Sequence, residues 1–222
     1  QLGSDLGRAA FERSLIIVEE GAALDFVEGC SAPKGISGDR NSVLEAFVEK
    51  NASLRAARLQ TWPSTVTYIA SKFVRAESGA RVEWLDGNLG ARFVLKRLRF
   101  DLGAGANGEI FFCGFAGPGQ EQNLEAHIAS VPGASSRVQE WVATRGNGRI
   151  LLLGNRPLAD RNRLRVEDIP ESQRFYLATR GLEGPPAEAV ALHAFFEPFA
   201  RRLPLEFSVE FSRLLDAELT AL

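Results

Sequence analysis

Short apolar runs alternate with polar residues over positions 14 to 153, and many of them lead into or out of a small-residue corner. LIIV and LDFV flank Gly21, and KFV and RVEWL flank Gly79. Alternation with a period of two is typical of a strand with one buried face. The pattern therefore predicts a series of short β-strands separated by tight turns.

The corners recur at a nearly constant interval. Each contains an alanine, and the gaps between successive alanines are 30, 28, 26 and 28 residues. A regular repeat of strand-like runs predicts the coils of a parallel β-helix, or β-solenoid, in which each coil covers the next. An antiparallel sandwich, with turn signals every ~8 to 12 residues, is the alternative. The residue before each alanine is glycine or asparagine, which adopt positive φ most easily: Gly21, Asn51, Gly79, Gly105 and Gly133.

The repeat stops near residue 153, and the rest of the chain indicates helices. Residues 154–169 are rich in proline and arginine and predict a connector. A first helix is expected from Pro170, which suits the first turn, to Gly181, which suits a helix end. The predicted organisation is a lead-in at 1–13, a β-helix core at 14–153, the connector, and a C-terminal helical domain at 170–222.

Two further helices follow from the spacing of apolar residues. The second is expected to bury Val190, Ala194, Phe195 and Phe199, and Pro198 within it is expected to kink or shorten the helix. The third has one apolar stripe, which consists of Phe207, Phe211, Leu214, Leu215 and Leu219.

Composition narrows the functional classes. The 222 residues carry a formal net charge of −2, which gives no reason to expect a nucleic-acid or membrane partner. No apolar run approaches the ~18 residues of a membrane span. Two cysteines are too few for a secreted disulfide framework, so a cytoplasmic location is expected. The chain begins at Gln1 and contains no methionine, so a fragment of a longer protein is one interpretation.

The sequence lacks the usual signals of catalysis. The phosphate-loop pattern GxxxxGK[ST] is absent, so this chain is not expected to bind a nucleotide. A serine nucleophile would need a histidine base, and neither His127 nor His193 is accompanied by a GxSxG segment. His193 is expected to have a packing or surface role. We expect a protein that is not an enzyme.

The two cysteines suggest different roles. Cys113 in IFFCGF is expected to be a small buried hydrophobic residue. Cys30 follows Gly29, and its thiol is expected in an accessible loop just after a strand. No CxxC pair exists, so a self-contained zinc or four-cysteine cluster site is excluded. Cys30 is therefore either a structural cysteine or a ligand in a site that a second chain completes.

An ordered set of longer segments resembles the SufB/SufD family of iron–sulfur cluster assembly proteins. The segments are LIIVEEGAALDFVEGCSAP, QTW, VEWLDGNLG, FAGPGQEQ, FYLATRG and FFEPFARRLPLEFSVEFSRLL. They span residues 14–146 and 171–219, and EGC-SAP together with WxDGNxG leans toward SufB. The resemblance implies a right-handed parallel β-helix core with a helical C-terminal domain.

The resemblance also implies a mechanism. SufB and SufD form a complex with the ATPase SufC, which docks on the C-terminal helical domain and opens the SufB–SufD interface where the cluster is built. Cys30 maps onto the cysteine of the EGC motif and His127 onto the histidine after GQxQ, as metal ligands. Phe195, Phe196 and Phe199 map onto the SufC-docking region. An iron–sulfur cluster would be bound transiently across an interface with a SufB/SufD-type chain or a second copy of this one.

One departure from the family stands between residues 149 and 171. The family has several more strands there, which carry a cysteine and a histidine segment associated with the cluster, and this chain has neither. The leading interpretation is a non-catalytic scaffold subunit of a Suf-type assembly complex. The alternative is a reduced β-solenoid that acts only as an architectural partner, without a cluster. A carbohydrate-active β-helix enzyme would need acidic residues clustered on one face, whereas here the acids are scattered.

Overall fold

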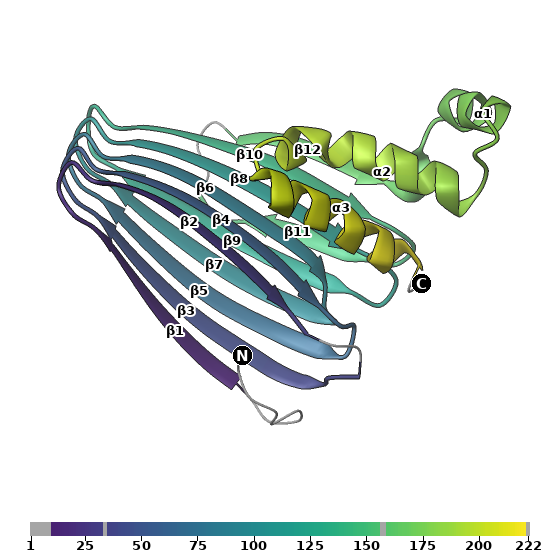
Figure 1. Ribbon diagram of the computed structural model, residues 1–222, viewed down its shortest axis with the longest axis horizontal. Coiled ribbons are helices and arrows are strands. Elements are labelled where there is room, and N and C mark those ends of the chain that lie inside the picture. Colours follow the sequence, from purple (N-terminus) through teal and green to yellow (C-terminus); the bar gives the residue numbers. More distant parts are fainter. Residues whose placement is uncertain (1–9, 33–34, 156–158, 221–222) are drawn as a thin grey trace.

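The computed structural model describes residues 10–32, 35–155 and 159–220 and shows a parallel β-solenoid with helices against one side (Figure 1). Its strands form two six-stranded sheets, one of odd-numbered and one of even-numbered strands. We call them the odd sheet and the even sheet. All pairings are parallel, for example β3 with β5 and β4 with β6. The predicted β-solenoid is confirmed, and the antiparallel sandwich is excluded.

The strands succeed one another from coil to coil in sequence order. The odd sheet contains β1 (Ala10–Val18), β3 (Gly38–Val48), β5 (Val66–Ala76), β7 (Phe93–Leu102), β9 (Glu121–Ser130) and β11 (Arg149–Leu153). The even sheet contains β2 (Ala23–Ser31), β4 (Ser53–Trp62), β6 (Arg81–Gly90), β8 (Asn107–Ala116), β10 (Ser135–Thr144) and β12 (Ala159–Arg165).

The five corners predicted from the repeat are turns with left-handed backbone. Their φ values are 71° at Gly21, 56° at Asn51, 70° at Gly79, 68° at Gly105 and 86° at Gly133. The amides of the first three donate to carbonyls of the next corner at 3.0 to 3.1 Å. Successive corners therefore stack on one another, as the repeat predicted.

The space between the sheets divides into an apolar and a polar half. Near the corners the inward side chains are apolar, and Trp84 packs edge-on against Phe100 at a centroid distance of 5.8 Å. Farther from the corners the inward side chains are polar or charged although they are buried, as at Arg58, Lys72 and Asp86. Burying charge is costly unless it is paired, so this half of the interior is where a functional role is to be sought.

A helical unit covers the outer face of the even sheet. It comprises the 3-10 helix η1 (Val166–Asp168) and helices α1 (Glu171–Thr179), α2 (Pro185–Ala200) and α3 (Leu205–Thr220). Helices α2 and α3 lie along the sheet, and α1 stands at the far end (Figure 1). Their buried side chains form a second core with outward residues of the even sheet, which include Leu59, Leu85, Phe111, Phe115 and Trp141. No helix in the described ranges is long and apolar enough to cross a membrane.

The structure differs from the expected boundaries in the connector and the lead-in. Within the expected connector, 154–169, strand β12 pairs with β10 and extends the even sheet. Strand β1 begins at Ala10, inside the expected lead-in, of which residues 1–9 lie outside the described residues.

Helix α2 also differs from expectation. It continues through Pro198 to Ala200. Pro198 and Ala194 are exposed, so water can satisfy the Ala194 carbonyl that the proline leaves without a partner. Val190 and Ala194 are exposed too, and the buried face consists of Ala187, Ala191, Leu192, Phe196 and Phe199. The predicted stripe of α3 is confirmed, since Phe211, Leu215 and Leu219 are buried and Phe207 and Leu214 pack against them.

Candidate functional site

Cys30 lies within strand β2 and not in the loop that the sequence suggested. It pairs with Gln60 of β4, and its thiol is half-buried. Burial raises the pKa of this thiol, the carboxylate of Glu28 raises it further, and the guanidinium of Arg58 acts in the opposite direction. The thiol is therefore enclosed among charged groups at the β1–β2 end of the solenoid.

Arg58 and Glu28 form an ion pair beside Cys30. Arg58 is 1% exposed, and its Nε and Nη2 donate to Oε2 of Glu28. Burial alone would lower the pKa of Arg58, but Glu28, Tyr68, Asp86 and Cys30 together outweigh it and the pKa is raised. The guanidinium therefore stays charged. Its Nη1 has no hydrogen-bond partner among the described residues.

One carboxylate holds two lysines deeper in the interior. Asp86 accepts from Lys72 and, at 2.6 Å, from Lys96, and Trp84 Nε1 lies 3.3 Å from the same carboxylate. Burial lowers the pKa of each lysine, while Asp86 opposes that effect. Burial alone would raise the pKa of Asp86, but the two ammonium groups outweigh it and hold the pKa well below its ordinary value.

A neutral network adjoins these charges. The Tyr68 hydroxyl lies 2.7 Å from Ser42 Oγ and accepts from Gln60 Nε2. Burial raises the pKa of Tyr68 to about 12, so the phenol stays protonated. Within the described part of the chain, Gln60 Oε1, Gln122 Oε1 and both amide atoms of Asn88 lack a partner. Buried polar atoms of this kind are usually satisfied by internal water.

None of these buried charges was singled out from the sequence. A signal was present in RVEWLDGN, where Val82 and Trp84 face the interior and the same phase continues through Asp86 and Asn88. Extending the strand phase past the last apolar residue would have placed both polar side chains inside.

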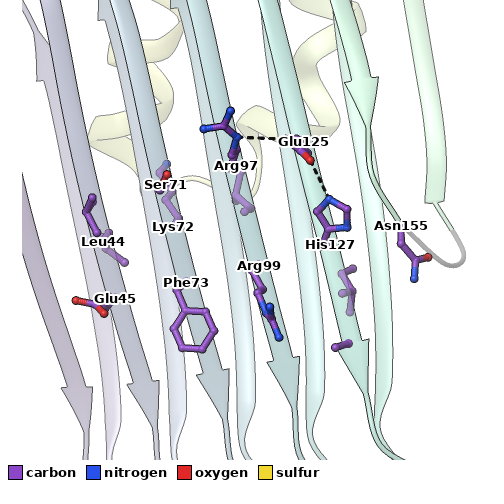
Figure 2. Close-up of a pocket in the computed structure, with 14 residues that line it drawn as sticks. Leu44, Glu45, Ser71, Lys72, Phe73, Arg97, Arg99, Glu125, His127 and Asn155 are labelled. Atoms are coloured by element: carbon purple, nitrogen blue, oxygen red, sulfur yellow. Dashed lines mark hydrogen bonds and ion pairs between the residues drawn. The ribbon is translucent and has the colours of Figure 1, made fainter.

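His127 lies in a different place. It stands on the outer face of the odd sheet, where Oε1 of Glu125 lies 3.0 Å from its Nε2 (Figure 2). The other carboxylate oxygen of Glu125 lies 3.4 Å from Nε of Arg97. This face carries a shallow groove of about 660 Å³, which Phe73 and Arg99 also line. Cys30 belongs to the first coil and His127 to the fifth, about 19 Å away along the axis at ~4.8 Å per coil. The structure does not bring these two predicted ligands together.

The remaining cysteine and histidine have structural settings. Cys113 is completely buried in the core between the even sheet and the helices, which confirms the prediction of a small hydrophobic residue, and burial raises the pKa of its thiol. His193 of α2 lies 2.7 Å from Asp216 of α3 through its Nε2. It links two helices at the surface.

The phenylalanines assigned to partner docking are mostly core residues. Phe196 and Phe199 are 0% exposed and contact Phe211 edge-on or tilted, and only Phe195 is partly exposed. Phe196 and Phe199 therefore cannot contact a partner while the helices stay docked. The large apolar side chains that the helical unit does expose are Phe175, Tyr176, Val190, Leu205 and Val209.

Comparison with known proteins identifies the family. The family described as SUF system FeS cluster assembly, SufBD core domain, matches residues 2–156. Iron–sulfur cluster assembly SufBD family proteins of Staphylococcus epidermidis, Staphylococcus haemolyticus and Staphylococcus saprophyticus are each 30% identical to the chain over 249 residues. The alignments cover 94% of this chain and 54% of each relative, so the chain spans about half the length of the relatives it matches.

The aligned span is longer than the 222 residues of this chain, so the relatives contain residues within it that the chain lacks. The solenoid, the ordered set of sequence segments and both comparisons agree. The chain belongs to the SufBD family of iron–sulfur cluster assembly proteins.

Proposed function

We propose that the chain is a non-catalytic scaffold subunit of a Suf-type assembly complex, in which it works with a SufC-type ABC ATPase in the cytoplasm. The observation that carries this proposal is the position of Cys30. Its thiol sits in the polar part of the solenoid interior, beside the guanidinium of Arg58. Iron binds to the thiolate form, and the Arg58 guanidinium opposes the rise in thiol pKa that burial and the Glu28 carboxylate cause.

The nascent cluster is the cargo of this scaffold, and the chain supplies only part of its ligands. Cys113 is buried in the core, and His127 lies on the opposite sheet. A cluster with several thiolate or imidazole ligands therefore needs a second chain, either a SufB/SufD-type partner or another copy.

The ATPase assignment is supported by the helical unit. The sequence has no phosphate loop, so ATP hydrolysis has to come from a partner. Helix α1 exposes Phe175 and Tyr176 side by side in sequence, 71% and 57% exposed. Exposed aromatic side chains of this size are typical anchors of protein interfaces.

Anaerobic reconstitution with iron and sulfide tests the scaffold role, with the chain purified together with its SufB/SufD-type partner. The wild-type complex is expected to develop the visible charge-transfer absorbance of a cluster, and a Cys30→Ser variant to lose most of it. Cys113→Ala is the matched control and is expected to keep it. Equal absorbance in all three proteins would remove Cys30 from the assembly site.

Co-purification with the SufC-type ATPase tests the docking surface. A Phe175→Asp/Tyr176→Asp double variant is expected to lose the ATPase while its circular dichroism stays native. Leu153→Asp, an exposed apolar residue on β11 outside the helical unit, is the control and is expected to retain it. Retention of the ATPase by the double variant would place the docking surface elsewhere.

The second candidate function is a purely architectural partner without a cluster. This candidate is favoured because the relatives contain residues within the aligned span that this chain lacks. This candidate predicts that the ATPase co-purifies while no charge-transfer absorbance develops in any variant. The two experiments together therefore separate the candidates.

A further inference from the structure

Three metal-ligating side chains converge at the β1–β2 end of the interior. Glu12 of β1 and Glu28 and Cys30 of β2 place one ligand atom each within 4.8 Å of the other two. Glu28 and Cys30 share a face because they are two residues apart on one strand, and Glu12 meets them from the facing strand. The described residues contain no second group of three such side chains.

We propose that Glu12, Glu28 and Cys30 form a binding site for a single divalent transition-metal ion. One thiolate and two carboxylates suit an ion of borderline softness, such as Fe²⁺, Co²⁺ or Zn²⁺, and do not suit Mg²⁺ or Ca²⁺, which prefer oxygen alone. Bonds of ~2.0 to 2.3 Å place tetrahedral ligands about 3.3 to 3.7 Å apart, so ligand atoms that lie within 4.8 Å of one another need to approach by at most about 1.5 Å.

Arg58 provides an independent indication of a ligand at this position. It is 1% exposed, and two of its nitrogens hold Glu28, as an outer-shell residue holds a metal-binding carboxylate. Its Nη1 donor is buried and has no partner among the described residues, and the guanidinium interacts electrostatically with Cys30. A site with three protein ligands keeps a fourth position for water or an anion, and Nη1 is a donor for that fourth ligand.

The charges of the cluster also balance with a divalent ion. Two carboxylates and a thiolate carry three negative charges, and the paired Arg58 carries one positive charge. The remaining charge of −2 is neutralised by M²⁺. This site goes beyond cluster assembly and does not depend on it, because a single ion can bind whether or not the chain assembles clusters.

Anaerobic titration of the purified chain with Co²⁺ alone tests the proposal. Wild type is expected to bind one Co²⁺ with thiolate-to-cobalt charge-transfer absorbance in the near ultraviolet. Cys30→Ser is expected to lose that band, and Glu12→Gln to weaken binding about tenfold or more. Cys113→Ala and Glu19→Gln, an exposed acid of the same coil, are the matched controls and are expected to bind as wild type does.

Circular dichroism on each variant confirms that it is folded before its affinity is compared. The proposal is overturned if wild type shows no charge-transfer band, if Cys30→Ser retains it, or if Cys113→Ala loses it. Reconstitution with iron and sulfide on the same proteins keeps the two proposals apart. Cobalt binding without cluster formation contradicts only the scaffold role, and cluster formation without cobalt binding contradicts only this site.

Discussion

At the scale of single residues, Asp86 holds the charged interior together. It is the shared partner of Lys72 and Lys96, and all three side chains are buried. Buried ion pairs are not necessarily more stabilising than apolar packing, but removing one partner leaves uncompensated charge in a medium of low polarity. The interior therefore tolerates these lysines only while Asp86 is ionised.

An Asp86→Asn substitution is expected to lower the free energy of unfolding by about 3 to 5 kcal/mol, because it leaves two buried ammonium groups without a counter-ion. Chemical denaturation measures the loss. Asp101→Asn removes an exposed ion pair with Arg99 and is expected to cost less than about 1 kcal/mol. Similar losses in the two variants would mean that the buried triad contributes no more than a surface pair.

The same carboxylate predicts an acid sensitivity. The pKa of Asp86 is lower in the folded chain than its ordinary value of 3.8. Below about pH 4 the unfolded chain therefore binds a proton that the folded chain does not, and stability falls as the pH drops. The difference in unfolding free energy between wild type and Asp86→Asn is expected to shrink below about pH 4. A difference that stays constant from pH 7 to pH 3 would contradict the assignment.

At the scale of elements, the turns decide how the coils stack. Gly21 and Gly90 both have positive φ, 71° and 75°, at opposite ends of the even sheet's strands. A Cβ at Gly21 would meet nothing within 4 Å, whereas a Cβ at Gly90 would overlap the backbone oxygen of Trp62 in the preceding coil. An alanine would therefore meet similar backbone strain at both positions, but only at Gly90 would its Cβ also clash with the preceding coil.

Alanine substitutions at these two glycines separate strain from stacking. Gly21→Ala is expected to cost about 1 kcal/mol from the left-handed backbone alone. Gly90→Ala is expected to cost at least about 2 kcal/mol more, because the backbone of Trp62 has to move. Denaturation midpoints of both variants measure the difference. Equal losses of unfolding free energy in the two variants would show that the backbone at Trp62 moves aside at little cost.

The sequence predicted one row of turns and missed the other for a physical reason. The row from Gly21 to Gly133 needs a left-handed residue followed by a small one in every coil, so the same letters recur. The opposite turns differ in length, and although some contain a positive-φ glycine, as at Gly35, Gly90 and Gly119, the turn between β4 and β5 contains none, so they form no regular repeat.

The candidate site was predictable only in part. Cys30 and the end of its strand were read from the sequence, but its loop position was wrong because β2 extends to Ser31. Glu12 and Glu28 lie sixteen positions apart and meet only when β1 and β2 fold onto each other. The assignment of Phe196 and Phe199 to a docking surface overlooked the even sheet, whose outer face is apolar and needs a cover.

At the scale of the whole molecule, the two faces of the even sheet belong to two cores. One fills the solenoid, and the other lies under α2 and α3, where Phe211 contacts Phe196 and Phe199 at centroid distances of 5.9 and 5.6 Å. The odd sheet has no helix on its outer face within the described residues (Figure 1). Because the helices bury one face of the even sheet, we expect them to unfold with the solenoid and not as an independent domain.

A Phe211→Ala substitution tests this coupling. It is expected to lower the free energy of unfolding by about 3 to 5 kcal/mol, because it opens a cavity between the helices and the even sheet. Helix ellipticity and the fluorescence of the three tryptophans, which include Trp84 in the solenoid and Trp141 under the helices, are expected to change in one coincident transition. Val209→Ala, an exposed position on the same helix, is the control and is expected to shift neither signal. Loss of helix ellipticity at a lower denaturant concentration than the fluorescence change would show that the helical unit unfolds on its own.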